Sequence, residues 1–162
     1  MPEFFKRLTV NYSHETQLSF ENCAIGSMDG SLSLFRFRAD APLPDAFFHG
    51  MARFDREYLL NRARKMGLEE YVEEIRVPTL TFESLSRKHG IRRIDLLQID
   101  TEGFDFEIIK MAFALGIFPE IINYEWTELP PPQRRECKIM LLEHGYRFVD
   151  VGPDVLCVRS TE

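Results

Sequence analysis

Cysteine and histidine are scarce in this sequence, and their spacing does not fit a metal site. Three cysteines, Cys23, Cys137 and Cys157, and four histidines are scattered along 162 residues. A structural zinc site needs four such ligands at short, regular intervals, so no metal is predicted. Three cysteines cannot all pair, and each lies in an apolar setting. We therefore expect buried free thiols in a reducing compartment.

Long apolar runs and an excess of positive charge are also missing. No run approaches the roughly 18–20 residues that span a bilayer, and residues 1–6 lack the layout of a secretory signal. The net charge of −6 does not support general binding to nucleic acid or anionic membranes. The G-x-G-x-x-G pattern is absent, which disfavours an NAD-type oxidoreductase. These absences predict a cytoplasmic globular protein whose length fits one domain.

The most informative stretch runs from Arg93 to Lys110. Its first half, Ile94–Ile99, is a nearly continuous apolar run, which is typical of a strand buried on both faces of a parallel sheet. Its second half has apolar residues at helical spacing. Between them lies Asp100-Thr101-Glu102-Gly103, at the carboxyl end of the strand, where open α/β sheets bind ligands. We therefore predict half of a small-molecule site at this junction.

The rest of the chain alternates between strand and helix patterns. We expect a loop over residues 39–48 and helices over 2–12, 51–66, 81–89, 106–116 and 133–144. Strands are expected over residues 18–25, 31–37, 71–77, 94–99, 118–126, 146–151 and 155–159. Thr81 suits a helix N-cap, and Gly67 and Gly90 suit C-caps. The order predicts an α/β fold with a mixed sheet that a C-terminal antiparallel hairpin closes.

Four segments, in order along the chain, resemble the FkbM-type methyltransferases. Asn22–Leu34 is similar to the family's "NAALGxxDGxxxL", Val77–Leu85 to its "VPTxTLDDL", and Ile94–Gly103 to its "IDLLKIDVEG". Near the end of the chain, Glu143–Tyr146 is similar to the family's "LxxxGY". Any one segment alone is a weak signal, but together they cover most of the chain and are specific.

The resemblance implies a Rossmann-like methyltransferase fold that uses S-adenosylmethionine and methylates a hydroxyl group of a small molecule or sugar. The family begins with a strand and a glycine-rich turn, "DxGAxxG", which holds the methionine part of the cofactor. No such turn occurs here. Residues 1–12 instead resemble a later family segment, "EPxPxxFxxLxxN". We therefore expect residues 1–162 to form one methyltransferase-like domain in which the first strand and helix, and with them the second strand, are missing.

Three carboxylates are candidates for the catalytic work. By the resemblance, Asp100 lies beside the methyl donor, where it would position the acceptor hydroxyl or accept its proton. From the residues alone, Asp100 equally suits a cap of the following helix. Glu102 is expected to share the catalytic work or to lie at the helix N-terminus, where negative charge is favoured. Glu125 is expected to line the acceptor pocket or to be merely exposed, and Gly103 to serve backbone geometry only.

Cofactor contacts are expected at a second place in the chain. By the resemblance, Asn22, Cys23, Ala24 and Ile25 border the adenine of S-adenosylmethionine, together with Asp100 at the methyl donor. An Asn side chain can both donate to and accept from an adenine edge. The alternative is that this segment is only a strand end that packs under a turn.

An arginine-rich segment offers a further candidate. Its arginines, interleaved with aromatic residues, would grip an anionic acceptor; the interpretation we favour is a solvated helix face. The residues concerned are Arg53, Arg56, Arg62 and Arg64, with Phe54 and Tyr58. No partners suggest themselves for His49 and His89, which are expected to be structural or exposed.

A second class of function is consistent with the same residues. The chain would then be a catalytically inactive, methyltransferase-like module that serves interaction or dimerisation. Because the missing elements leave the edge of the Ile94–Ile99 strand without a partner, we predict a homodimer through that edge. Binding of cofactor would favour the enzyme, and binding of a second copy alone would favour the module.

Overall fold

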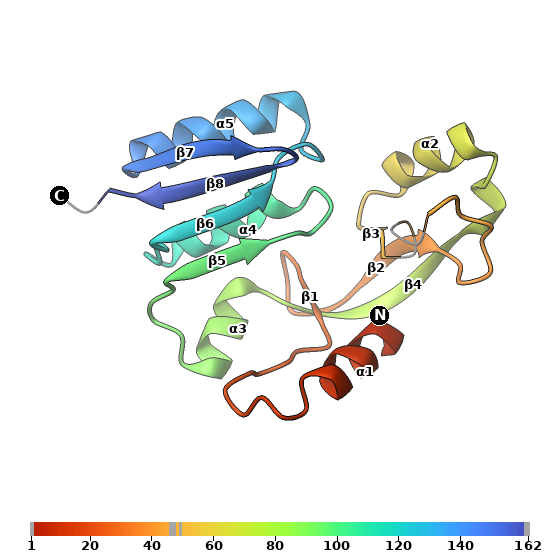
Figure 1. Cartoon of the computed structure of the whole chain (residues 1–162), viewed down its shortest axis with the longest axis horizontal. Coiled ribbons are helices and arrows are strands. Elements are labelled where there is room, and N and C mark those ends of the chain that lie inside the picture. Colours follow the sequence, from red (N-terminus) through yellow and green to blue (C-terminus); the bar gives the residue numbers. More distant parts are fainter. Residues whose placement is uncertain (1, 46–47, 49, 161–162) are drawn as a thin grey trace.

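Two four-stranded sheets organise the structure, a computed structural model that describes residues 2–45, 48 and 50–160 (Figure 1). The first has the order β1-β4-β2-β3 and consists of β1 (Ala24–Ile25), β2 (Gly30–Phe37), β3 (Ala52–Arg53) and β4 (Val72–Leu80). The second has the order β5-β6-β8-β7 and consists of β5 (Leu96–Ile99), β6 (Ile121–Glu125), β7 (Tyr146–Val151) and β8 (Asp154–Arg159). We call them sheet A and sheet B.

The helices are α1 (Pro2–Asn11), α2 (Arg56–Met66), α3 (Phe82–His89), α4 (Asp105–Ala114) and α5 (Pro131–Glu143), with a short 3₁₀ turn, η2 (Glu69–Tyr71). Thr81 caps α3 by accepting the Ser84 N–H at 3.1 Å, and Gly67 and Gly90 follow α2 and α3 in the left-handed conformation, as predicted. An α/β fold with mixed pairing is therefore confirmed. It has two sheets where the sequence analysis expected one.

Sheet B contains the parallel pair and the terminal hairpin that the sequence predicts. β5 and β6 run parallel, β8 pairs antiparallel with β6, and β7 closes the hairpin with β8. The main core lies between this sheet and its helices. Ile109 and Ala112 of α4, Cys137 and Leu141 of α5, and Ile122 of β6 are fully buried there.

The other face of sheet B is open, which corrects the prediction that the Ile94–Ile99 strand is buried on both faces. Leu96 is 56% exposed, and Val158, which lies two strands away in the same row, is also exposed. β5 forms the edge of the sheet and pairs only with β6 among the described residues. An apolar run therefore identified the strand but did not show how many of its faces are covered.

The strand predicted over residues 18–25 is reduced to the two residues of β1. The Leu80 carbonyl accepts the Gly26 N–H at 3.0 Å, so Leu80 directs its backbone groups toward β1, and so does Pro78 two residues earlier. Proline has no N–H to donate. Extending β1 backwards would place Cys23 opposite Pro78, where a ladder hydrogen bond has no donor. The parallel ladder consequently begins at Ala24.

The helix predicted over residues 51–66 begins five residues later, at Arg56. Asp55 caps it by accepting the Tyr58 N–H at 3.0 Å, while Arg53 pairs with Phe35 of β2. The cap at Asp55 and the strand pairing of Arg53 therefore fix the start of the helix at Arg56, although the residues before it have helical spacing in the sequence. As a result, Arg53 leaves the helix face on which the sequence analysis placed it.

The three cysteines are free. Cys137 and Cys157 are buried as predicted, and burial raises the pKa of these thiols to about 11 and about 12. Cys23 is only partly buried. His89 contacts Glu21 at 2.7 Å at the surface, and His49 lies outside the described residues.

Candidate functional site

A cavity of about 740 Å³ lies between the two sheets, at the carboxyl ends of β5 and β6. Its volume is within the range of small-molecule pockets. The lining comes from β1 with the residue before it, Leu34 of β2, β3 with the start of α2, the loop after β5, and the loop after β6 with the start of α5. The lining residues used below are Cys23, Ala24, Ile25, Arg53, Phe54, Tyr58, Glu102, Gly103, Phe104, Glu128 and Leu129.

Glu102 is one of the carboxylates that line this cavity. Its backbone has a φ of 55°, which is uncommon for a residue with a side chain, and its side chain is only 16% exposed. Burial raises its pKa to about 7, and the charges of Glu125 and Glu128 add to the effect while Arg53 opposes it. A carboxyl group with a pKa near neutrality can accept and release a proton at physiological pH.

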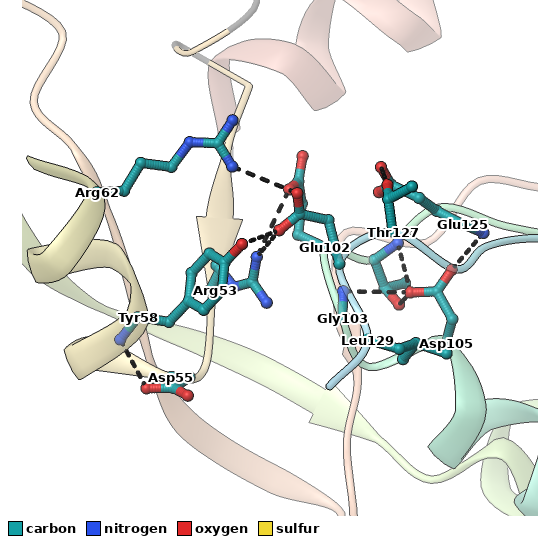
Figure 2. A network of polar contacts seen from close by, with 12 residues as sticks. Arg53, Asp55, Tyr58, Arg62, Glu102, Gly103, Asp105, Glu125, Thr127 and Leu129 are labelled. Carbon is teal, nitrogen blue, oxygen red and sulfur yellow. Dashed lines mark hydrogen bonds and ion pairs between the residues drawn. The ribbon is translucent and has the colours of Figure 1, made fainter. Parts of the chain in front are cut away.

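Asp105 holds the loop that carries Glu102 (Figure 2). This side chain is fully buried. One carboxylate oxygen accepts the Thr101 hydroxyl at 2.7 Å and the N–H groups of Thr101 and Gly103 at 3.4 and 3.3 Å. The other accepts the Glu125 N–H at 3.1 Å. Asp105 therefore ties the end of β5 to the end of β6 and fixes the backbone on either side of Glu102.

Across the cavity, Arg53 of β3 reaches from sheet A to the loops of sheet B. Its Nη1 donates to Glu128 Oε2 at 2.5 Å and lies 4.0 Å from Glu102 Oε2. Its guanidinium carbon lies 3.7 Å from the centre of the Tyr58 ring, a close cation–π contact. The side chain is only 6% exposed. The interpretation of Arg53 as part of a solvated helix face is thus wrong.

Glu128 receives two further contacts from α2. The Tyr58 hydroxyl donates to it at 2.7 Å and Arg62 at 3.3 Å. Burial by itself would raise the pKa of Glu128, but the hydrogen bonds from Tyr58 and Arg53 lower it below its usual range. Glu128 is therefore an ionised partner of the arginines, in contrast to Glu102.

Gly103 has a steric reason to be glycine in addition to its φ of 106°. A Cβ at this position would lie 2.4 Å from Arg53 Nη2 and 3.1 Å from the Glu128 carbonyl oxygen. The guanidinium of Arg53 therefore rests directly on the Gly103 backbone. The expectation that Gly103 serves backbone geometry alone is incomplete.

The remaining predicted catalytic residues lie beside the cavity. Asp100 is exposed and does not line it; partial burial raises its pKa, with help from the charges of Asp105 and Asp154. Asp100 also does not cap α4, because that helix begins at Asp105 and Phe104 occupies the N-cap. Glu125 is half-buried outside the lining, and its carboxylate accepts the Thr127 hydroxyl at 3.0 Å.

The predicted cofactor segment lies only partly at the cavity. Cys23, Ala24 and Ile25 line the cavity, whereas Asn22 is exposed and does not. Among the arginines, Arg53 and Arg62 contact Glu128, while Arg56 and Arg64 are exposed on α2. Phe54 meets Phe104 edge to face across the cavity, with ring centres 5.5 Å apart.

Sequence reasoning missed Glu128 and Asp105. Glu128 follows β6, and the rule that drew attention to Glu125 at that strand end applies equally to it. Asp105 is an acidic residue at the start of a helix, a position usually explained by the helix dipole alone. Its burial depends on the β6 backbone, which lies twenty residues further along the chain, so no local signal was present.

The described part of the chain contains neither a cluster of metal ligands nor a membrane-spanning helix. No group of three or more His, Cys, Asp or Glu residues there is arranged to hold a metal ion. No helix within that part is long and apolar enough to cross a membrane.

A cavity at the carboxyl ends of parallel strands, with a partly buried carboxylate of raised pKa, is the site expected of an α/β enzyme. The model of the methyltransferase FkbM domain matches residues 2–148 of the chain. The chain belongs to the FkbM methyltransferase family, so the family resemblance and the assignment as a methyltransferase are confirmed. No curated protein and no solved structure shows significant similarity to it.

Proposed function

We propose that the protein is an S-adenosylmethionine-dependent O-methyltransferase whose acceptor is a hydroxyl group of a small molecule or sugar. The observation that carries the proposal is Glu102, a partly buried carboxylate of raised pKa that lines the cavity in a chain of this family. In this site Glu102 holds the acceptor hydroxyl through a hydrogen bond and takes its proton as the oxygen gains the methyl group. When bound, S-adenosylmethionine supplies that methyl group as an electrophile.

The residues of the cavity wall fit one side of such a cofactor. Cys23, Ala24 and Ile25 provide a largely apolar wall that suits the flat adenine ring. The uncovered face of sheet B and the two-sheet α/β arrangement are compatible with a Rossmann-like methyltransferase fold. According to this proposal, Asp100 and Glu125, whose side chains lie next to the cavity, influence the reaction through the negative charge that they place near Glu102.

The catalytic contribution of this arrangement is mainly positional. Holding two reactants in a reactive geometry can supply roughly 7–11 kcal/mol of the barrier, so few chemical groups are needed. A single general base typically adds a further 10²- to 10⁴-fold in rate. Glu102 is the group in this cavity with a pKa suited to that role.

Calorimetric titration with S-adenosylmethionine, followed by transfer of a labelled methyl group to a library of hydroxyl compounds, tests the proposal. We expect Glu102→Gln to bind cofactor as the unaltered protein does and to transfer methyl groups about 10²-fold more slowly or worse. Glu143→Gln, an exposed site on α5, is the matched control and is expected to leave both unchanged. Absence of cofactor binding in the unaltered protein would refute the proposal.

A further inference from the structure

A second cavity, of about 510 Å³, lies at the opposite end of sheet B from the first. It is bordered by the amino ends of β5 and β6 and the carboxyl end of β8, on the side of sheet B that faces away from sheet A (Figure 1). Its volume is also within the range of small-molecule pockets. The two cavities share no lining residue among those that the structure describes. The role of this cavity therefore lies outside the proposed function.

Backbone hydrogen bonds hold the three strand ends that border the second cavity. The Glu120 N–H, just before β6, donates to the Ile94 carbonyl, just before β5, at 3.3 Å. The Glu120 carbonyl in turn accepts the Arg159 N–H at the end of β8, at 2.9 Å. Because these bonds continue the pairing of the sheet to its last residues, the side chains at this end project from a fixed backbone.

Three arginines line the second cavity, and two of them have no carboxylate partner within the described part of the chain. Arg93 pairs with Asp95 at 2.7 Å and with Glu120 at 2.6 Å, so its charge is compensated. Arg92 and Arg159 make no ion pair there, and their side chains donate no hydrogen bond to a described residue. A surplus of positive charge therefore remains at this end of a chain whose net charge is −6.

The guanidinium of Arg159 is positioned without the use of its N–H groups. Its carbon lies 4.8 Å from the centre of the Phe118 ring, a cation–π contact, and that ring stacks on His144 with ring centres 5.3 Å apart. The carbonyls of Ala112 and Phe113 in the last turn of α4 already accept backbone N–H groups from the residues that follow. The five N–H donors of Arg159 are thus available to a ligand.

These donors restrict the ligand to a small anion with several oxygen atoms. A guanidinium binds a carboxylate or a phosphate group through two parallel N–H groups. A carboxylate has two oxygen atoms and one charge, which a single guanidinium satisfies. A phosphate group has three terminal oxygen atoms and a charge of about −1.5 to −2 at pH 7, so it can serve two. Two unpartnered guanidiniums, Arg92 and Arg159, therefore favour phosphate.

We propose that the second cavity is a binding site for a phosphate group, which the guanidiniums of Arg92 and Arg159 hold. Arg93, whose charge its two carboxylates balance, takes no part. The cavity is larger than a phosphate group, so it accommodates a small phosphomonoester as well as free phosphate. Neither the site nor its test depends on methyl transfer, so each proposal can fail while the other stands.

Amide NMR titrations at constant ionic strength test the proposal, with inorganic phosphate and ribose 5-phosphate as probes and acetate as control. We expect both probes to give saturable shifts in residues 92–94, 116–118 and 159–160, and to bind about tenfold more tightly than acetate. Tighter binding of ribose 5-phosphate identifies a phosphomonoester as the ligand, and equal or weaker binding identifies free phosphate. No saturable shift at these residues, or an equal affinity for phosphate and acetate, overturns the proposal.

Matched variants assign the binding to the two guanidiniums. Arg92→Gln and Arg159→Gln each remove one charge from an exposed side chain, and each is expected to weaken phosphate binding about tenfold. Arg135→Gln removes the same charge from an exposed position of α5 outside the cavity, and is expected to leave the affinity unchanged. Equal weakening in all three variants, or an unaltered affinity in either cavity variant, contradicts the proposal. The amide spectra also report whether each variant is folded.

Discussion

Sheets A and B contribute to one cavity but differ in how firmly they are packed. Among the described residues, sixteen buried side chains form the core around sheet B, and six form the smaller core under the outer part of sheet A. Sheet B presents carboxylates whose backbone Asp105 fixes, while sheet A presents an arginine on a strand of two residues. The carboxylate side of the cavity is therefore rigid, and the arginine side is the more adaptable one.

Two leucines of equal burial provide the strongest test of that difference. Leu141 in the core of sheet B and Leu59 in the core of sheet A are both 0% exposed. We expect Leu141→Ala to lower the free energy of unfolding by about 4 kcal/mol and Leu59→Ala by about 2 kcal/mol, both within the usual range. Chemical denaturation gives the free energies. Equal losses would remove the distinction between the two sheets.

Hydrogen exchange sharpens the same comparison. In Leu59→Ala the amides of β2, β3 and α2 are expected to exchange faster, while those of α4 and α5 keep their protection. In Leu141→Ala protection is expected to fall throughout the described chain. Faster exchange in α5 of Leu59→Ala would show that the two cores unfold as one unit.

Asp105→Asn removes the anchor of the rigid side. In the unaltered protein the N–H groups around Asp105 donate to a carboxylate oxygen, whereas an amide would place a second donor against some of them. We therefore expect a loss of about 3 kcal/mol in unfolding free energy. The amides of Thr101, Gly103 and Glu125 should shift most in NMR spectra. Asp95→Asn, at an exposed carboxylate of the same strand region, serves as control and is expected to change stability by less than about 0.5 kcal/mol.

The raised pKa of Glu102 makes the carboxylate side sensitive to pH. A carboxyl group whose folded pKa is about 7 and whose unfolded pKa is near 4.5 binds more protons when folded. Its stabilising contribution is complete below about pH 4.5 and is lost as the pH rises through 7. We expect melting temperatures between pH 5 and pH 8 to fall less in Glu102→Gln than in the unaltered protein. Parallel curves would show that Glu102 titrates normally.

The smallest effect, on self-association, is expected at the open face and edge of sheet B. Leu96 at the edge and Val158 in the same row are exposed apolar side chains, and a homodimer through β5 stays our prediction for this surface. Light scattering at rising concentration is expected to show self-association that Leu96→Lys weakens severalfold. Val10→Lys, an exposed apolar site on α1, is the control. A monomer at every concentration would contradict this prediction.

The sequence predicts the elements of sheet B more accurately than those of sheet A. The run Leu96–Ile99, the hairpin at Gly152 and the caps at Thr81 and Gly90 are local signals, and the structure confirms them. The short length of β1 depends on Pro78, more than fifty residues away, and the burial of Arg53 depends on Glu128. Contacts between distant segments determine both, so periodicity could not reveal them.

The same limit applies to the site. The acidic strand end correctly identified the loop after β5, because ligand sites in α/β sheets follow a general rule. It did not distinguish Asp100 from Glu102, since the choice depends on the path of the loop, in which Glu102 has a backbone φ of 55° and lines the cavity while Asp100 does not. The arginine facing it came from a segment that resembles an ordinary amphipathic helix.

Pro78 also decides what holds the boundary of the cavity in place. By ending the β1 ladder at Ala24, it leaves residues 16–23 outside the sheet, and Cys23 is the member of this segment that lines the cavity. Glu21 fastens the segment to the end of α3 through contacts of 2.7 Å with Lys88 and with His89. One missing backbone donor thus replaces strand hydrogen bonds by ion pairs near the surface, which salt can screen.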